Sequence, residues 1–123
     1  FCYRALNDLP YHVYEDHHRS FTYVKDTVRT LANIVDNFRS GEVYNIAGQE
    51  YTNIGELSDM ILGYLDKDDS QVEYRGTEKH NTLNKRTNSE KAESDLNHRV
   101  TVPLDEGIPS TIEWMCDHYD IDR

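Results

Sequence analysis

Two arginines stand where an anionic ligand could bind. Arg19 directly precedes a β-prone run at 20–24, and Arg75 ends a second such run at 71–75, where a long polar stretch begins. In α/β proteins ligands bind where loops follow the ends of strands. Arginine offers planar, paired donors that match phosphate oxygens. The two positions predict a site for a dianionic ligand, unless each arginine pairs with one of the many surface carboxylates.

The charge of the chain limits its partners. Its 123 residues include 23 acids against 13 lysines and arginines, which gives a formal net charge of -10. Because so acidic a chain repels phosphate backbones and anionic lipids, we expect neither nucleic acid nor a membrane as a partner. Cys2 and Cys116 lie near opposite ends without a metal-binding spacing, which favours free thiols in a reducing cytoplasm.

The sequence lacks the residue sets that would name a catalyst. Its six glycines are too widely spaced for a dinucleotide-binding turn or a phosphate-binding loop. None of the nine tyrosines is followed four residues later by a lysine, the spacing that would place an ammonium beside a tyrosine acid/base. The run Glu-Asp-His-His at 15–18 indicates a solvated loop, because adjacent side chains point in different directions and metal ligands converge. We expect no catalytic, cofactor-binding or metal-binding residue in this chain.

Strands are expected to alternate with helices. Short β-prone runs predict strands at 12–14, 20–24, 42–47 and 71–75. Apolar residues at intervals of three and four predict helices at 26–38, 53–65, 88–96 and 103–119. This order is typical of an α/β unit, and one domain or part of one is expected over residues 1–123. The uncapped, helix-like start at Phe1 suggests a fragment of a longer chain.

Short sequence signals predict where the helices begin, where a binding loop lies and which side of the first long helix is buried. Asp26 is expected to cap the first long helix, and Asn53 with Glu56 predicts a capping box for the second. The polar stretch 76–88 is too long for an ordinary connection and predicts a binding loop. The first long helix should bury one apolar stripe, formed by Val28, Leu31, Ala32, Val35 and Phe38.

Three segments, 19–26, 41–48 and 104–114, recur in this order in one family. They resemble the C-terminal part of the extended short-chain dehydrogenases/reductases, the NAD-dependent sugar-nucleotide epimerases and dehydratases. Each segment is a weak signal alone, but three in order at these separations are specific. The resemblance covers the chain from about Leu9 to Trp114. It implies an α/β fold that forms the C-terminal portion of an extended Rossmann-type enzyme, with 1–123 as its substrate-binding subdomain.

The resemblance also implies roles for single residues. Arg19 resembles the family arginine that contacts the diphosphate of a sugar nucleotide. The segment Arg75-Gly-Thr-Glu78 is similar to one in which the arginine binds phosphate and the acid accepts hydrogen bonds from the ribose hydroxyls. Further substrate-binding positions implied by the resemblance are Tyr11, Val13 and Tyr14 along the nucleobase and Asn45 near the phosphates.

Everything catalytic in this family lies upstream of the matched part. The resemblance implies that NAD in the whole enzyme oxidises the sugar at C4, that the enzyme is an isomerase or a lyase, and that it is a homodimer through helices outside this chain. We expect a nucleotide-diphosphate sugar as the partner and no activity for this chain alone. Epimerase and dehydratase both stay open, as do the nucleobase and the sugar. The alternatives are a nucleotide-sugar-binding module without catalysis and an acidic interaction domain.

Overall fold

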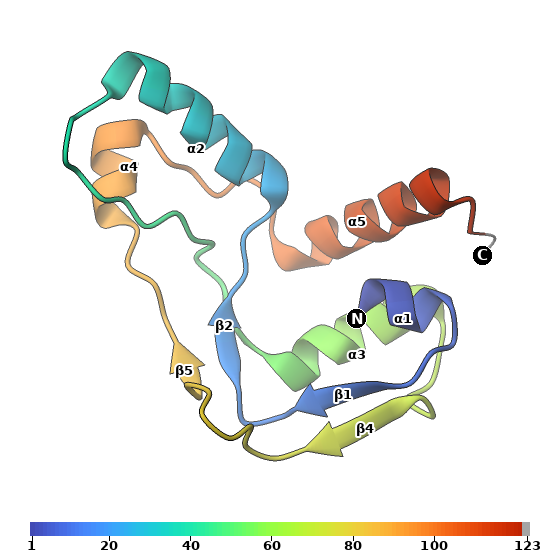
Figure 1. Cartoon of the computed structure of the whole chain (residues 1–123). Helices are drawn as coiled ribbons and strands as arrows, with labels where there is room; N and C mark the ends of the chain where they lie inside the picture. The colour runs from blue at the N-terminus through green and yellow to red at the C-terminus, as the bar shows by residue number, and fades with distance from the viewer. Residues whose placement is uncertain (122–123) are drawn as a thin grey trace.

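A computed structural model describes residues 1–121, so the last two residues of the expected range 1–123 lie outside the described part. The chain folds into two lobes joined by a small sheet (Figure 1). The elements are, in chain order, α1 (Cys2–Leu6), β1 (Tyr11–Tyr14), β2 (His18–Ser20), α2 (Val24–Asn37), β3 (Tyr51–Asn53), α3 (Ile54–Leu65), β4 (Val72–Arg75), β5 (Asn84–Lys85), α4 (Glu90–Leu96) and α5 (Leu104–Tyr119). In the part described, no helix is long and apolar enough to cross a membrane.

Two small sheets organise the molecule. β1 and β4 pair in parallel, with Tyr14 opposite Arg75. In the other sheet β2 lies between β3 and β5, antiparallel to β3 and parallel to β5. Both arginines singled out from the sequence are therefore strand residues, Arg19 in the centre of β2 and Arg75 at the end of β4.

The main hydrophobic core lies in the lobe built from α1, β1, α3, β4 and α5. Burying a large aliphatic side chain contributes about 1.5–3 kcal/mol relative to leaving it exposed, so this cluster carries much of the stability of the lobe. Its buried members are Ala5, Leu6, Tyr11, Val13, Ile61, Leu62, Ile108 and Ile112.

Several helix ends follow the predicted local chemistry. The Asn53 side chain accepts a hydrogen bond from the Gly55 amide at 2.6 Å, and the Glu56 carboxylate accepts one from the Asn53 amide at 3.2 Å. The predicted capping box is thus confirmed at the start of α3. Asn97 ends α4 in the left-handed conformation with φ of 51°, as expected.

The predicted strands at 42–47 and 20–24 are wrong. The structure has no strand between α2 and β3, since no other strand lies beside 42–47 to pair with it. The strand predicted at 20–24 is β2, which lies earlier, at His18–Ser20. Helix α2 already begins at Val24, so Asp26 lies inside its first turn and Tyr23 takes the N-cap position that was predicted for Asp26. The segment around Gly48 instead crosses the backbone of Phe21, where a Cβ on Gly48 would lie 1.5 Å from the Phe21 carbonyl oxygen. Only glycine fits there.

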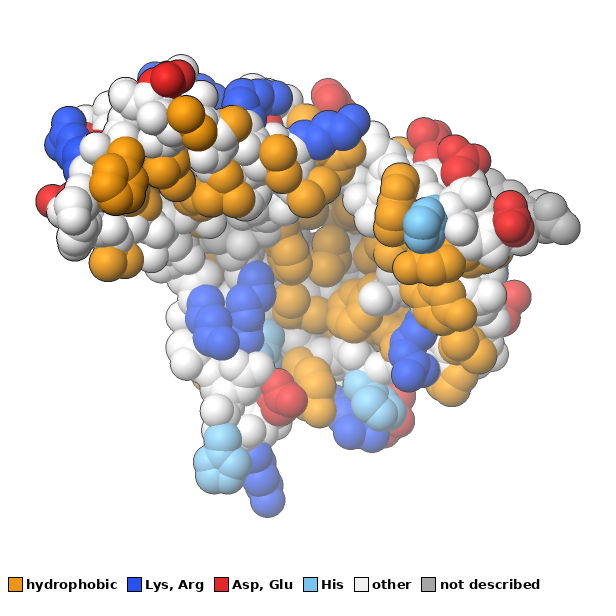
Figure 2. Space-filling model, turned by 45° about the horizontal axis from the view of Figure 1, so that its top comes forward, with side chains coloured by type: hydrophobic (Ala, Val, Ile, Leu, Met, Phe, Trp, Pro, Cys, Tyr) orange, Lys and Arg blue, Asp and Glu red, His pale blue; other side chains and the backbone are white. Residues whose placement is uncertain are grey.

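The apolar side of α2 faces outward, whereas the sequence predicted that it is buried. Val28, Leu31, Val35 and Phe38, expected in the core, are 58%, 50%, 83% and 73% exposed. Hydrophobic side chains accordingly gather along the outer surface of the lobe that contains α2 (Figure 2). We call this set the α2 apolar face. A helix that turns its apolar side outward leaves unburied the surface that would stabilise it.

Polar contacts hold the inner side of α2 against α4. His98 is fully buried, and its Nε2 lies 2.9 Å from the Ala47 carbonyl oxygen, which can only accept. Nε2 therefore donates to this carbonyl, and Nδ1 lies 2.7 Å from the hydroxyl oxygen of Thr30, which itself donates to the Asp26 carbonyl at 2.9 Å. Asn33 donates to the Leu96 carbonyl at 2.8 Å. Buried hydrogen bonds thus help to hold α2 against the segments around α4.

A buried carboxylate fixes the start of α2. Asp26 is fully buried and accepts hydrogen bonds from the Thr101 hydroxyl at 2.6 Å, the Thr101 amide at 2.9 Å and the Val102 amide at 3.2 Å. Burial by itself would raise the pKa of this carboxyl. The three hydrogen bonds and the nearby Arg29 guanidinium outweigh burial and hold the pKa of Asp26 below its ordinary value.

Replacing Asp26 by asparagine should lower the free energy of unfolding by about 1–3 kcal/mol at pH 7, because the amides of 101–102 lose their charged acceptor. The folded pKa is depressed, so the contribution of Asp26 is present above the unfolded pKa of about 3.9 and is lost as the pH falls through the folded pKa. Urea unfolding from pH 7 down to pH 3 should show the difference between wild type and Asp26→Asn narrowing below about pH 4. Asp36→Asn, on the exposed side of α2, is the matched control. A difference that stays constant down to pH 3 would contradict this account.

Candidate functional site

Arg19 is held by the protein itself. Its Nη1 donates to the carbonyls of His18 at 2.7 Å and Leu83 at 2.9 Å. Its Nη2 lies 3.1 Å from His17 Nδ1 and donates to Asn81 Oδ1 at 3.3 Å. Four of the five N–H donors of this guanidinium are therefore engaged. Arg19 ties the loop at 76–83 between β4 and β5, hereafter the β4–β5 loop, to strand β2.

His17 connects the predicted site residues, and sequence reasoning missed it. The side chain is 2% exposed, and its Nε2 lies 3.2 Å from the amide nitrogen of Glu78. Its ring is 5.7 Å from that of Tyr14. The run containing it was interpreted as a solvated loop, and a single histidine two residues before an arginine is not a specific signal. Its role comes entirely from long-range packing.

Glu78 lies in the β4–β5 loop and is ordered by Asn81. The Asn81 side-chain amide donates to the Glu78 carboxylate at 2.5 Å, while its oxygen accepts from Arg19. Arg19 and Glu78 are thus linked twice, through Asn81 and through His17. The structure brings these two predicted residues together.

Arg75 joins the same region through its backbone, while its side chain turns to a surface carboxylate. The Arg75 carbonyl accepts from the Glu15 amide at 3.1 Å, which places it beside the turn at 15–17 that leads into β2. Its Nε and Nη2 donate to Glu73 Oε1 at 3.0 and 2.8 Å. These two hydrogen bonds to one carboxylate oxygen, and to a smaller extent a hydrogen bond with Tyr14, raise the pKa of the Arg75 guanidinium. The pair with Glu73 is the alternative anticipated for an arginine in an acidic chain.

The remaining predicted site residues lie in different parts of the molecule. Tyr11 and Val13 are 4% and 0% exposed, and the Tyr11 hydroxyl lies 2.9 Å from that of Ser58, so both side chains belong to the core. Tyr14 is half-buried beside the turn at 15–17. Asn45 is exposed and donates to the Asn88 carbonyl at 3.4 Å, in the lobe of α2 and α4. The roles of these residues at a nucleobase or phosphate stay predictions.

Two further cations at the end of β5 were not anticipated. Lys85 is the register partner of Arg19 in the parallel pair of β2 and β5. The Arg86 guanidinium lies 5.9 Å from the ring centre of Tyr51, which itself stacks on His18 at 5.4 Å. A chain of charge -10 therefore presents a local group of cations on this small sheet. Such a group attracts anions locally whatever the net charge.

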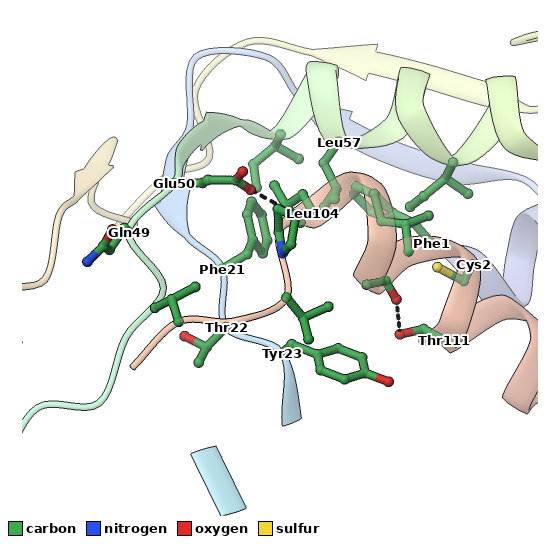
Figure 3. A pocket seen from close by; sticks show the side chains of 17 residues that line it. Phe1, Cys2, Phe21, Thr22, Tyr23, Gln49, Glu50, Leu57, Leu104 and Thr111 are labelled. Carbon is green, nitrogen blue, oxygen red and sulfur yellow. Dashed lines mark hydrogen bonds between the residues drawn. The ribbon is translucent and has the colours of Figure 1, made fainter. Parts of the chain in front are cut away.

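One apolar hollow lies apart from these residues. A cavity of about 430 Å³ opens between α3, α5 and the segment joining β2 to α2, and apolar side chains such as Phe21, Leu57 and Leu104 line it (Figure 3). The Glu50 carboxylate at its rim accepts from the Leu104 amide at 2.9 Å and so satisfies a free amide at the start of α5. Arg19, Arg75 and Glu78 do not line this cavity.

Curated relatives match most of the chain. A dTDP-glucose 4,6-dehydratase from an Actinoplanes strain is 31% identical over 117 residues, which cover 93% of this chain and 36% of that protein. A mouse dTDP-D-glucose 4,6-dehydratase is 28% identical over 102 residues, 78% of this chain and 28% of that protein. The chain thus spans about a third of the length of these relatives. No profile of a known protein family matches it.

Solved structures match nearly the whole chain. The dTDP-glucose 4,6-dehydratase from Bacillus anthracis, in complex with NAD, superposes with a TM-score of 0.82 at 22% identity, over 97% of this chain and 38% of that one. The chain thus has the fold of one part of this dehydratase. The UDP-glucose 4-epimerase from Thermotoga maritima, solved with UDP-glucose, gives a TM-score of 0.85 at 23% identity, over 96% of this chain and 38% of that one. The fold class expected from the sequence is confirmed.

The two arginines should differ sharply in their effect on stability. Arg19→Met removes the donors for two carbonyls and should lower the free energy of unfolding by about 1–2 kcal/mol. Arg75→Met should leave the urea midpoint unchanged, because its pair with Glu73 is solvent-exposed. Hydrogen exchange supplies the local test, since the His18 amide donates to Leu83 at 2.8 Å and should exchange faster only in Arg19→Met. Equal midpoints for both variants would show that Arg19 does not clamp the β4–β5 loop.

Proposed function

We propose that this chain is the nucleotide-sugar-binding C-terminal region of an NAD-dependent sugar-nucleotide dehydratase or epimerase. The observation that carries the proposal is the meeting of Arg19, Arg75 and Glu78 around the turn at 15–17. The similarity to dTDP-glucose 4,6-dehydratases over most of the chain supports it. So does the likeness to structures that hold UDP-glucose or UDP-glucuronic acid.

The chemistry available at the site is binding and orientation. Arg75 is bound to Glu73 on an exposed surface, and exposed ion pairs contribute little, so a diphosphate with its greater charge can take over the guanidinium. The cations Lys85 and Arg86 add attraction on the neighbouring sheet. The Glu78 carboxylate, steadied by Asn81, can accept hydrogen bonds from a neutral diol such as that of a ribose. Held in this way, the nucleotide fixes where its sugar lies in the whole enzyme.

The residues of this chain do not fit a dinucleotide. A pyrophosphate cradle needs closely spaced glycines between a strand and a helix. The six glycines lie at 41, 48, 55, 63, 76 and 107, and among the described residues none of them stands in such a turn. In our proposal NAD therefore binds to another part of the whole protein, and this chain alone does not turn over a nucleotide sugar.

The α2 apolar face supports the same proposal. Its four large side chains are each at least half exposed, and Val43 in the unpaired segment 42–47 is 79% exposed beside them in the sequence. Apolar side chains gathered in this way mark a surface that another protein surface covers. We propose that the dinucleotide-binding part of the whole enzyme covers it and that the segment 42–47 pairs with a strand of that part.

We also propose a cellular location and an oligomeric state for the whole protein. Cys2 and Cys116 are both free and half-buried, which supports a cytoplasmic protein. A homodimer formed through helices outside this chain is proposed from the family resemblance alone.

One observation favours the second candidate, an acidic interaction domain. Both arginines already have protein partners, Arg75 on Glu73 and Arg19 on the β4–β5 loop. In that case neither guanidinium would respond to a nucleotide.

Nucleotide binding separates the two candidates. In the presence of the dinucleotide-binding part of a matching dehydratase, UDP, dTDP or GDP should shift the NMR signals of 15–19 and 75–78 in the isotope-labelled chain. Arg75→Met should weaken that binding at least about tenfold, since a hydrogen bond to a charged group is lost. Lys79→Met, which removes an exposed charge from the same loop, should not. No response to any of the three nucleotides, or equal effects of the two variants, would favour the interaction domain.

The α2 apolar face should be needed for assembly and dispensable for folding. Val28→Gln combined with Val35→Gln should leave the urea midpoint unchanged, because both side chains are exposed. The same double variant should weaken association with the dinucleotide-binding part about a hundredfold, given about 1.5 kcal/mol for each valine that is buried on binding. Size-exclusion chromatography measures the association. Lys25→Gln combined with Asp36→Gln, elsewhere on α2, is the control. Association that is equally tight in all three proteins would exclude this face as the interface.

A further inference from the structure

The exposed face of the sheet formed by β1 and β4 carries three linked side chains. His12 is the register partner of Glu73, and Arg75 follows Glu73 two positions later, on the same face of the strand. Arg75 Nε and Nη2 donate to Glu73 Oε1 at 3.0 and 2.8 Å. The other carboxylate oxygen, Oε2, lies 2.9 Å from His12 Nδ1. One carboxylate therefore bridges a guanidinium and an imidazole.

Glu73 carries its negative charge at neutral pH. The hydrogen bonds from Arg75, and to a smaller extent the nearby His12, hold the pKa of Glu73 below its ordinary value. The three side chains are between 42% and 58% exposed. Because exposed ion pairs contribute little to stability, the contact between Glu73 and Arg75 can open without unfolding the lobe.

Glu73 opposes a second anion on Arg75. A guanidinium offers paired donors along two edges, one formed by Nε and Nη2 and the other by Nη1 and Nη2. Glu73 occupies the first of these edges. A phosphate on the second edge would share Nη2 with the carboxylate and lie within about 5 Å of it, so the two negative charges would repel each other. Tight binding of a phosphate group therefore requires Glu73 to leave the guanidinium.

We propose that Glu73 is a built-in competitor that sets the affinity of Arg75 for the phosphate groups of a ligand. In the free protein the carboxylate occupies the guanidinium. A diphosphate carries more charge than one carboxylate and replaces it, while Glu73 keeps its contact with His12 through Oε2. A ligand that offers only a carboxylate gains nothing over Glu73, so the site favours ligands of higher charge. This role rests on the proposed function, in which Arg75 binds the diphosphate, whereas the pairing of Glu73 with Arg75 does not.

Removing the competitor should strengthen binding. Glu73→Gln should lower the dissociation constant for UDP about fivefold, because a neutral amide holds the guanidinium less strongly and does not repel phosphate. Isothermal titration calorimetry, in the presence of the dinucleotide-binding part of a matching dehydratase, measures this constant. In an Arg75→Met background the same change should alter the affinity less than about twofold, since the group that Glu73 occupies is gone. Weaker or unchanged binding in Glu73→Gln would show that the carboxylate orients Arg75 for the ligand, and would overturn the proposal.

A matched variant separates competition for Arg75 from the general effect of charge. Asp59 is an exposed acid on α3, in the same lobe, and within residues 1–121 it forms no hydrogen bond with Arg75. Asp59→Asn removes the same charge as Glu73→Gln and should change the affinity for UDP less than about twofold. If both variants tighten binding equally, or if the gain from Glu73→Gln persists without Arg75, the net charge is responsible and the competitor is wrong.

The pairing itself is tested without a nucleotide. The Nε proton of Arg75 should exchange with water at least about fivefold faster in Glu73→Gln, because it loses a charged acceptor, and Asp59→Asn should not change it. Proton–nitrogen NMR spectra measure this rate, and Arg75→Met identifies the signal. Equal rates in Glu73→Gln and the unmodified chain would show that Glu73 does not occupy Arg75, and the proposal would fall.

Two probes distinguish failure of the competitor from failure of the proposed function. If Arg75→Met weakens UDP binding and Glu73→Gln does not tighten it, the competitor fails and the proposed function stands. If no nucleotide binds, but inorganic pyrophosphate shifts the Arg75 signal at lower concentration in Glu73→Gln than in the unmodified chain, the competitor stands and the proposed function fails. An Arg75 signal that responds to pyrophosphate in neither protein overturns both.

Discussion

The carboxylate of Asp26 joins the two halves of the molecule. It belongs to the first turn of α2, yet its hydrogen-bond donors come from the amides and hydroxyl at 101–102, in the connection that leads from α4 into α5. One buried acid therefore fixes the direction of α2, the path of that connection and the start of α5. The cost of burying the charge is offset because each donor lies within hydrogen-bonding distance. The orientation of the α2 apolar face follows from this anchor, since Thr30 and His98 continue the same polar contact one turn later.

The turn at 15–17 plays the corresponding part at the candidate site. It is short, and it receives contacts from β4, from the β4–β5 loop and from β2, so three separate segments share one small region. Arg19 and Glu78 are 59 positions apart in the sequence, and only His17 and Asn81 bring them into register. A site assembled in this way depends on buried polar contacts, which are costly when left incomplete.

Local signals predicted the parts of the fold that local chemistry decides. The capping box at Asn53 and the left-handed end at Asn97 need only a few neighbouring residues, and both are confirmed. The strand expected at 42–47 and the buried stripe of α2 are wrong for a shared reason. Each pattern describes what a segment can pair with, and no such partner lies beside it among the described residues. The apolar periodicity of α2 was correctly recognised, but periodicity gives the existence of a face and not the side on which it is covered.

The candidate site was predictable to a similar extent. The two arginines were found from their places beside β-prone runs and Glu78 through the family resemblance, and the structure brings all three to the turn at 15–17. His17, Asn81 and Lys85 were not found, because their contacts join residues that are far apart in the chain. The side-chain partners of Arg75 and Arg19 also follow from packing, which no spacing of residue types reports.

The outward-facing valines and Phe38 of α2 also bear on how copies of this chain behave toward one another. At low ionic strength a charge of -10 keeps molecules apart despite their apolar faces. Added salt shortens the reach of that repulsion to roughly 8 Å at 0.15 M, about the size of a few side chains. The same ions leave the attraction between apolar surfaces in place. The isolated chain therefore stays dispersed through charge repulsion, which salt weakens. When another protein surface covers the α2 apolar face, the tendency of the chain to associate with itself no longer depends on salt in this way.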